Sequence, residues 1–268
     1  PKSDRLVAAN VSEAMAHAQL EDWPRVVELL QPEASPFRQF ASSSAETGLA
    51  VQGRLILAEA LLRQRLYVDA TYILAQLSAL ELVDKDRWRR QMLLSRALIA
   101  QTRHKEALSI LEELLHTSEN RMPRLRAAQA VELKFYVHKE LRQYAKALEM
   151  CRNLWQDGMP LVVRRRGLLL ALDLAIRHDA PLDISEFHRR SKANLQNGSL
   201  AVAQVALGDF HLARNQETSK RGGFMDRNNQ LEKSREQYGA AIGSVFSGHA
   251  HAGLAWNLWQ SRRYGESY

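Results

Sequence analysis

Apolar residues along the chain gather into Leu-rich runs with helical spacing, and several runs are introduced in the same way. A short polar turn is followed by an aromatic residue or His, two variable residues, a small residue and then the run. The phrase is RQRLYVDATYIL from Arg63, TRHKEALSILEELL from Thr102 and ELRQYAKALEMC from Glu140, and its beginning returns as SRRYGES from Ser261. Such a repeated phrase predicts helical hairpins stacked along the chain.

The repeat length is measured between the small residues, which we call the anchors. Ala70 and Ala107 lie 37 positions apart, and Ala107 and Ala147 lie 40 positions apart. Weaker copies place Val26 as an anchor 44 positions before Ala70 and Ile184 as an anchor 37 positions after Ala147. Periods of about 34 to 47 residues are typical of solenoids built from helix pairs. We therefore expect an all-α fold of about six full units and a truncated seventh.

Small residues are needed where two helices of a hairpin cross, because the crossing requires close approach. The anchors supply them on the second helix. On the first helix we expect a large apolar residue and a small one, 13 and 12 positions before the anchor. The pairs that fit are Leu57 and Ala58, Leu94 and Ser95, and Leu254 and Ala255, and Leu207 and Gly208 in VALGDFHLA have the same character.

With its large and small pair, later aromatic residue and Ala anchor, the chain resembles the tetratricopeptide repeat family over nearly its whole length. The resemblance implies an α-solenoid, a right-handed superhelix of about six to seven stacked antiparallel helix pairs forming a single domain over residues 1–268. It also implies a non-catalytic scaffold for protein–protein interaction, which binds a peptide or partner protein on its concave face.

In this family the concave groove is lined from the first helix of each pair, at positions 18, 15, 11 and 8 before the anchor. The predicted groove residues are Arg89, Met92, Arg96 and Ile99 for Ala107, Gln52, Leu55, Glu59 and Leu62 for Ala70, and His249, Ala252, Trp256 and Trp259 for a last anchor at Ser267. Trp256 and Trp259 lie one turn apart and would form an aromatic patch, a common anchor at interfaces. The alternative is that both pack against a following helix.

One stretch departs from the repeat pattern. The sequence NQETSKRGGFMDRNNQ is polar and contains two adjacent glycines. With Ser234 as the next anchor, the interval from Ile184 is 50 positions, longer than any other. We therefore expect an inserted loop over residues 215–230, either a mobile binding element or a tolerated surface insertion. Its candidate contact residues are Arg221, Gly222, Gly223, Phe224 and Met225.

The charge balance raises the question of an acidic or nucleic-acid partner. The net charge is +7, and Arg residues cluster around Trp88, in the triplet Arg164 to Arg166 and at Arg262 and Arg263. Consecutive residues of a helix point about 100° apart, so a triplet cannot present all its charges to one ligand. The clusters also lack the interleaved aromatic residues of a single-strand platform. We favour solvated helix rims, and nucleic-acid binding rests on charge alone.

Signals for catalysis, cofactors and metals are missing from the sequence. It contains no glycine-rich phosphate loop and no Gly-x-Ser-x-Gly elbow. His249 and His251 are two positions apart, which on a helix directs them away from each other. Cys151 is the single cysteine and is expected on the buried face of a second helix, packed in the core of the protein. We expect no enzymatic activity, cofactor or metal site.

Two further functional interpretations stay open beside the scaffold. The chain begins with Pro1 and ends inside a copy of the phrase, which suggests a piece of a longer protein. It would then be a regulatory or sensor superhelix that binds a small ligand, or part of an exopolysaccharide-export assembly that binds polymer or synthesis enzymes. No apolar run is long enough to span a bilayer, and the sequence does not distinguish cytoplasm from periplasm.

Overall fold

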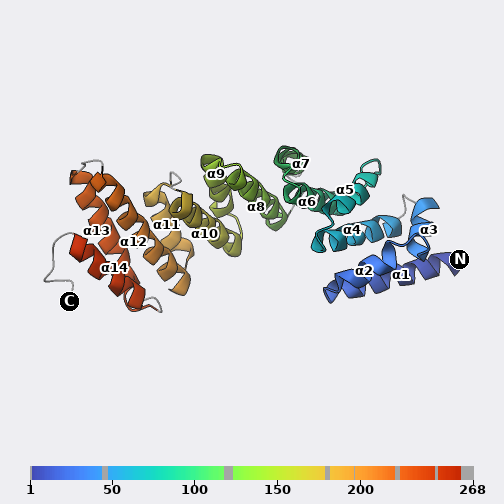
Figure 1. Cartoon of the computed structure of the whole chain (residues 1–268), viewed down its shortest axis with the longest axis horizontal. Coiled ribbons are helices and arrows are strands. Elements are labelled where there is room, and N and C mark those ends of the chain that lie inside the picture. Colours follow the sequence, from blue (N-terminus) through green and yellow to red (C-terminus); the bar gives the residue numbers. More distant parts are fainter. Residues whose placement is uncertain are drawn as a thin grey trace. The chain divides into compact units, whose positions relative to one another are not determined.

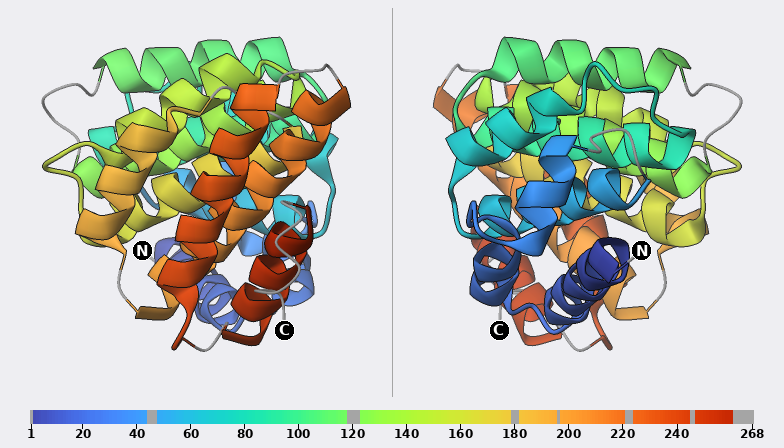
Figure 2. Two further views of the ribbon diagram at one scale, coloured as in Figure 1. Left: turned by 90° about the vertical axis from the view of Figure 1, so that its left-hand side faces the viewer. Right: turned by 90° about the vertical axis from the view of Figure 1, so that its right-hand side faces the viewer.

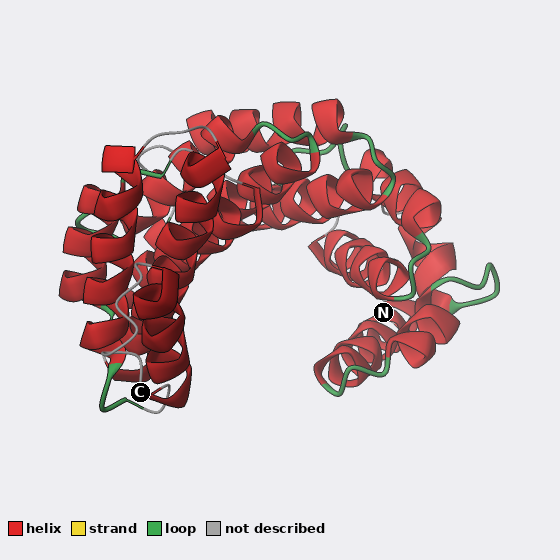
Figure 3. Ribbon diagram, turned by 60° about the vertical axis from the view of Figure 1, so that its left-hand side comes forward, coloured by secondary structure: helices red, strands yellow, loops and turns green. Residues whose placement is uncertain are grey.

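The computed structural model describes residues 2–43, 48–117, 123–178, 182–195, 197–220, 224–244 and 247–260. Every regular element in these ranges is an α-helix, as the all-α prediction requires (Figure 1, Figure 3). The helices are α1 (Lys2–Gln19), α2 (Trp23–Leu30), α3 (Pro36–Ser43), α4 (Gly48–Arg63), α5 (Tyr67–Gln76), α6 (Asp84–Ala100), α7 (His104–Thr117), α8 (Arg124–Glu140), α9 (Tyr144–Trp155), α10 (Leu161–His178), α11 (Ile184–Asn194), α12 (Asn197–Lys220), α13 (Phe224–Ala241) and α14 (Ser247–Gln260). No helix among the described residues is long and apolar enough to cross a membrane.

The chain divides into two compact units, residues 1–137 and 138–268. In the first unit α1 packs on α2, α4 on α5 and α6 on α7, while α4 also contacts α1 and α6. In the second unit α10 contacts α9, α11 and α12, and α12, α13 and α14 all contact one another (Figure 2). Thus, within each unit, the first helix of a pair also touches the first helix of the next pair. A single domain over the whole chain stays a prediction.

Four turns between paired helices share one backbone conformation. The residue two positions before the second helix has a positive φ, 58° at Glu21, 63° at Arg65, 60° at Thr102 and 56° at Arg142. These residues lie 44, 37 and 40 positions apart, which are the intervals between the anchors. The structural repeat and the sequence repeat therefore have the same phase.

Hydrogen bonds and burial fix the position of the anchor in the second helix. The amide of Leu66 donates to the Leu61 carbonyl at 2.9 Å, which closes α4 with the long bond of a Schellman motif. The amide of Ala70 then donates to the Leu66 carbonyl at 3.0 Å, so this anchor is the fourth residue of α5. Ala70, Ala107 and Ala147 are all fully buried. The anchors therefore lie where the two helices of each hairpin approach each other.

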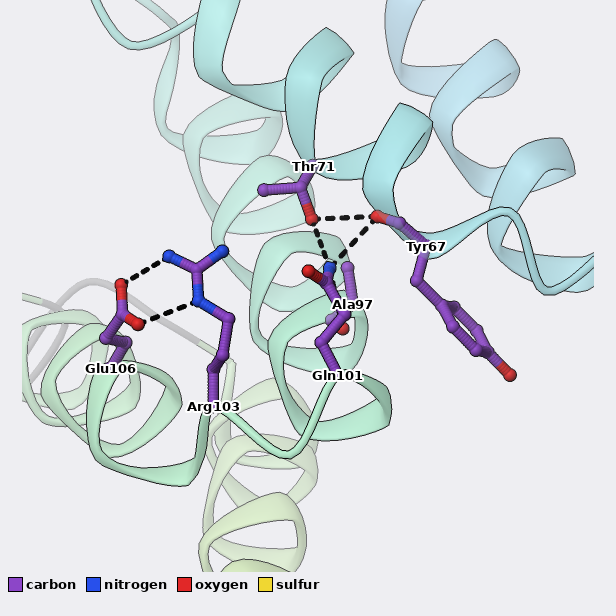
Figure 4. A network of polar contacts seen from close by, with 6 residues as sticks. All are labelled: Tyr67, Thr71, Ala97, Gln101, Arg103 and Glu106. Atoms are coloured by element: carbon purple, nitrogen blue, oxygen red, sulfur yellow. Dashed lines mark hydrogen bonds and ion pairs between the residues drawn. The ribbon is translucent and has the colours of Figure 1, made fainter.

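A polar network joins successive pairs in the first unit (Figure 4). The Gln101 side-chain amide, at the end of α6, donates to the Tyr67 carbonyl at 3.1 Å and to Thr71 Oγ1 at 2.7 Å in α5. Beside it, Arg103 and Glu106 form two hydrogen bonds of 2.7 Å on the exposed first turn of α7. Gln101 thus fixes the end of one hairpin's first helix against the preceding hairpin's second helix.

The long first interval has a structural cause. An additional helix, α3, stands between α2 and α4 and packs on both of them and on α1. Phe37 on α3 is buried, and its ring occupies the space beside Gly53, where a Cβ would lie 2.1 Å from the Phe37 ring. The interval of 44 positions therefore contains an element that the other repeats lack.

The fifth anchor is Phe187, and the prediction of Ile184 is wrong. Ile184 is the first residue of α11, whereas the amide of Phe187 donates to the Asp183 carbonyl at 2.9 Å, in the same way as the other anchors. Phe187 is fully buried and its ring contacts Trp155 edge to face. The matching large and small residues on the first helix are Leu174 and Ala175, which are both buried.

The predicted loop over residues 215–230 is also wrong in its extent. Helix α12 continues to Lys220 and α13 begins at Phe224, so most of this stretch is helical. The physical reason is that the Gln, Glu and Lys residues before the glycines favour a helix. Residues 221–223 lie outside the described residues, as do the side chains of Phe224 and Met225. From the fifth anchor Phe187 the interval to Ser234 is 47 positions, and it contains the long helix α12.

The crossing of α12 and α13 is built around a tyrosine between two glycines. The Tyr238 side chain is fully buried, and a Cβ on Gly208 of α12 would lie 2.7 Å from its ring. A Cβ on Gly253 of α14 would lie 2.3 Å from the same ring. Ser234, the predicted anchor, is fully buried, and its hydroxyl donates to the Gly208 carbonyl at 3.1 Å. Three helices therefore meet at Tyr238.

Candidate partner-binding surface

In five helix pairs the first helix carries two side chains on one side of that helix, because seven residues make two helical turns. One follows the small residue of the large and small pair, and the other lies seven positions earlier. We call this set the first-helix face. It consists of Gln52 and Glu59 on α4, Arg89 and Arg96 on α6, Leu169 and Ile176 on α10, Val202 and Asp209 on α12, and His249 and Trp256 on α14, all exposed or half-buried.

In the first unit an ion pair joins the face residues of neighbouring helices. Arg89 Nη2 on α6 lies 2.8 Å from Glu59 Oε2 on α4, and both side chains are partly shielded from solvent. The sequence pattern placed both residues in one groove, and the structure brings them together. Partial burial strengthens such a pair relative to one fully in water.

The second unit repeats this register with different residues. His249 Nε2 on α14 lies 3.4 Å from Asp209 Oδ2 on α12. Asp209 occupies on α12 the position that Glu59 has on α4, and His249 occupies on α14 the position that Arg89 has on α6. Asp209 also accepts a hydrogen bond from the Tyr238 hydroxyl at 2.5 Å. Burial and this hydrogen bond both raise the pKa of Tyr238, so its hydroxyl keeps its proton. Equivalent face positions are therefore neighbours in both units.

Three aliphatic side chains stand at face positions of α10 and α12. Leu169 is 37%, Ile176 43% and Val202 38% exposed, and α10 and α12 are in contact. We call these three residues the aliphatic patch. Sequence reasoning missed them because it counted groove positions only from the strongest copies. The sequence signal for them is a small residue on the first helix. Ala175 directly precedes Ile176, which lies seven positions after Leu169, and Gly208 directly precedes Asp209, which lies seven positions after Val202.

Not all predicted groove residues belong to the surface. Leu55 and Met92, 15 positions before their anchors, are 0% and 2% exposed, so their assignment to the groove is wrong. Met92 packs against Leu111 and Leu114 of α7, because its position on α6 points into the helix pair. The other residues predicted for α4 and α6 are not buried, Gln52 and Arg96 being exposed and Leu62 and Ile99 half-buried.

The predicted tryptophan patch is described in part. Trp256 is 46% exposed on α14, two turns after His249, and Ala252 between them is exposed. The side chain of Trp259 and the proposed anchor Ser267 lie outside the described residues. Trp256 thus remains as the large aromatic residue of the face.

Arginines of the basic clusters contact the protein itself. Besides the pair of Arg89, Arg90 Nε donates to the Leu74 carbonyl at 2.9 Å, and burial lowers the pKa of Arg90. Arg165 Nε donates to the Asn194 carbonyl at 2.9 Å. These arginines help to hold helices together. Arg262 and Arg263 lie outside the described residues.

No protein-family model matches the chain, and no curated protein does. Among solved structures, the crystal structure of BtubC (BKLC) from P. vanneervenii aligns with 91% of this chain and 93% of its own chain. The sequence identity is 16% and the TM-score is 0.39. A TM-score at this level is too low to assign the chain to the fold of that protein.

Proposed function

We propose that the chain is a tetratricopeptide-like solenoid whose first-helix face binds a peptide or partner protein without catalysing a reaction. The recurrence of one contact carries the proposal, since Glu59 with Arg89 and Asp209 with His249 join equivalent positions. A surface built from the same two positions of successive helices is continuous within each unit. Such repeat surfaces are suited to holding extended partners.

The side chains of the face favour a protein partner over nucleic acid. Its aliphatic patch and Trp256 offer exposed apolar area, and large apolar residues dominate the energy of protein interfaces. In each unit a carboxylate of the face, Glu59 or Asp209, already pairs with a neighbouring basic side chain, which leaves that basic side chain less available to phosphates. The positive net charge of the chain still favours acidic residues in the partner outside the patch.

A matched pair of substitutions tests this assignment. Peptides would be selected against the whole chain from a randomised display library, and the affinity of the best peptide would be measured for Ile176→Ser and Ile242→Ser. Both isoleucines are 43% exposed, but Ile242 follows α13 and lies outside the face. We expect Ile176→Ser to weaken binding about ten-fold, the effect of truncating one interface anchor.

Equal losses for the two variants, or a loss for Ile242→Ser alone, would remove the face from the proposal. A steep fall of peptide affinity with rising salt would show that charge and not the aliphatic patch holds the peptide. Circular dichroism of both variants provides the control for folding.

A further inference from the structure

The additional helix α3 creates a pocket that the repeat pattern does not require. The pocket has a volume of about 290 Å³ and lies among α3, α4 and α5 of the first unit. Pockets for drug-sized ligands occupy roughly 300 to 1,000 Å³, so this one suits a small molecule. Its lining residues are Phe37, Arg38 and Ala41 of α3, Arg54 and Leu57 of α4, and Ile73 and Gln76 of α5.

The pocket combines an apolar wall with two guanidinium groups. Leu57 and Ile73 are buried aliphatic residues of its lining. Burial lowers the pKa of Arg54, and the charge of Arg38 lowers it further, so the two positive charges act on each other. Among the described residues that line the pocket, none is acidic. The local potential therefore favours an anion.

The parts of the pocket are held in place by contacts of their own. Arg54 Nη2 donates to the Ala41 carbonyl at 2.7 Å, which ties α4 to the end of α3. Phe37 is locked against Gly53. A rigid site loses little entropy on binding.

We propose that this pocket binds a small organic acid, with its carboxylate between Arg38 and Arg54 and its apolar body against Leu57 and Ile73. Arginine is suited to this role because its planar donors match the two oxygens of a carboxylate. Gln76, which also lines the pocket, can donate a further hydrogen bond from its amide. None of the residues that line the pocket belongs to the first-helix face. The binding of an acid in the pocket can therefore be tested separately from the binding of a protein partner.

Calorimetric titration of the whole chain tests the site with defined probes. The acid probe is 3-phenylpropionate, the neutral control is 3-phenyl-1-propanol, and inorganic phosphate tests for binding of any anion. We expect the acid to bind, and the alcohol and phosphate each to bind at least about ten-fold more weakly. The alcohol lacks the carboxylate, and phosphate lacks the apolar body. The variants are Arg38→Gln, which removes a charge, and Gln76→Glu, which places a competing carboxylate in the pocket.

Both variants should weaken the binding of the acid about ten-fold or more. Arg189→Gln, an equal change of charge at an exposed residue of α11, should leave the affinity for the acid unchanged. Because Gln76→Glu removes no contact of α3, it still decides the question if Arg38→Gln unfolds. Absence of acid binding to the unmodified chain would overturn the proposal. Equal binding of the alcohol or of phosphate would also overturn it, as would unchanged acid affinity in Gln76→Glu.

Discussion

The hydroxyl of Tyr238 donates to Asp209 Oδ1 over 2.5 Å, and this bond connects the buried crossing of α12 and α13 to the first-helix face. The ring of Tyr238 is enclosed between the glycines of two first helices. Its polar end reaches the carboxylate that also contacts His249. One residue thus packs the core and orients a face residue.

Replacing Tyr238 with Phe should lower the free energy of unfolding by about 1.5 to 3 kcal/mol, the range for a hydrogen bond to a charged group. The ring would stay in place and the carboxylate of Asp209 would lose a donor. Urea denaturation measures the difference. Tyr72→Phe, at a tyrosine 62% exposed on α5, is the control and should change stability by less than about 0.5 kcal/mol. Equal stability of Tyr238→Phe and the unmodified chain would contradict the role of the bond.

The same variant predicts a pH dependence. The pKa of Tyr238 is raised by burial and by the bond to Asp209, above the ordinary tyrosine value of about 10. In the unfolded chain the hydroxyl loses its proton near that ordinary value, so the stabilisation is complete below about pH 10 and is lost as the pH rises beyond it. The stability difference between the unmodified chain and Tyr238→Phe should therefore be constant up to about pH 9 and shrink above 10. A constant difference at higher pH would contradict the assignment.

The glycine at the α14 crossing should not tolerate a methyl group. In Gly253→Ala the new Cβ would overlap the Tyr238 ring, and we expect a loss of about 1 to 3 kcal/mol from overpacking. Gly239 on α13 has open space around its missing Cβ, so Gly239→Ala should instead stabilise the chain by about 0.5 to 1 kcal/mol through helix propensity. Thermal or urea unfolding compares the two. A destabilising Gly239→Ala together with a neutral Gly253→Ala would refute the packing described for Tyr238.

The anchors were predictable from the sequence because close helix crossing directly selects small residues, as at Ala70 and Ala107. The fifth anchor was misplaced because Pro181 stands where the aromatic marker is expected and because Phe187 is not a small residue. The burial of Met92 could not be predicted from its distance to the anchor in the sequence, because it depends on how α7 packs against α6. The aliphatic patch was not predicted because groove positions were assigned only to the copies at Ala70, Ala107 and Ser267.

The positive φ of the turn residues could not be predicted from the sequence for another reason. A positive φ is usually signalled by glycine, yet Arg65 and Thr102 adopt it without one. These turns are imposed by the hairpin, which needs the Schellman bond to close its first helix.

Thr102→Gly should therefore stabilise the chain. Threonine is β-branched and strained at φ 60°, and its replacement by glycine should gain about 1 kcal/mol despite the entropy cost of glycine. Ala100→Gly, two positions earlier in the right-handed part of α6, should instead cost about 0.5 to 1 kcal/mol. Urea denaturation of both variants gives opposite signs if the turn is as described. Destabilisation in both would show that Thr102 is not strained.

Site-specific photo-crosslinking tests the central claim, that the first-helix face binds a peptide or protein, most directly. A photoreactive residue would replace Ile176 in one variant of the whole chain and Ile242 in another, and each would be illuminated with the selected peptide. The two sites are equally exposed, so reactivity alone cannot separate them. We expect peptide crosslinks from position 176 that excess unlabelled peptide abolishes, and none from position 242. Crosslinks from position 242 without any from position 176 would contradict it.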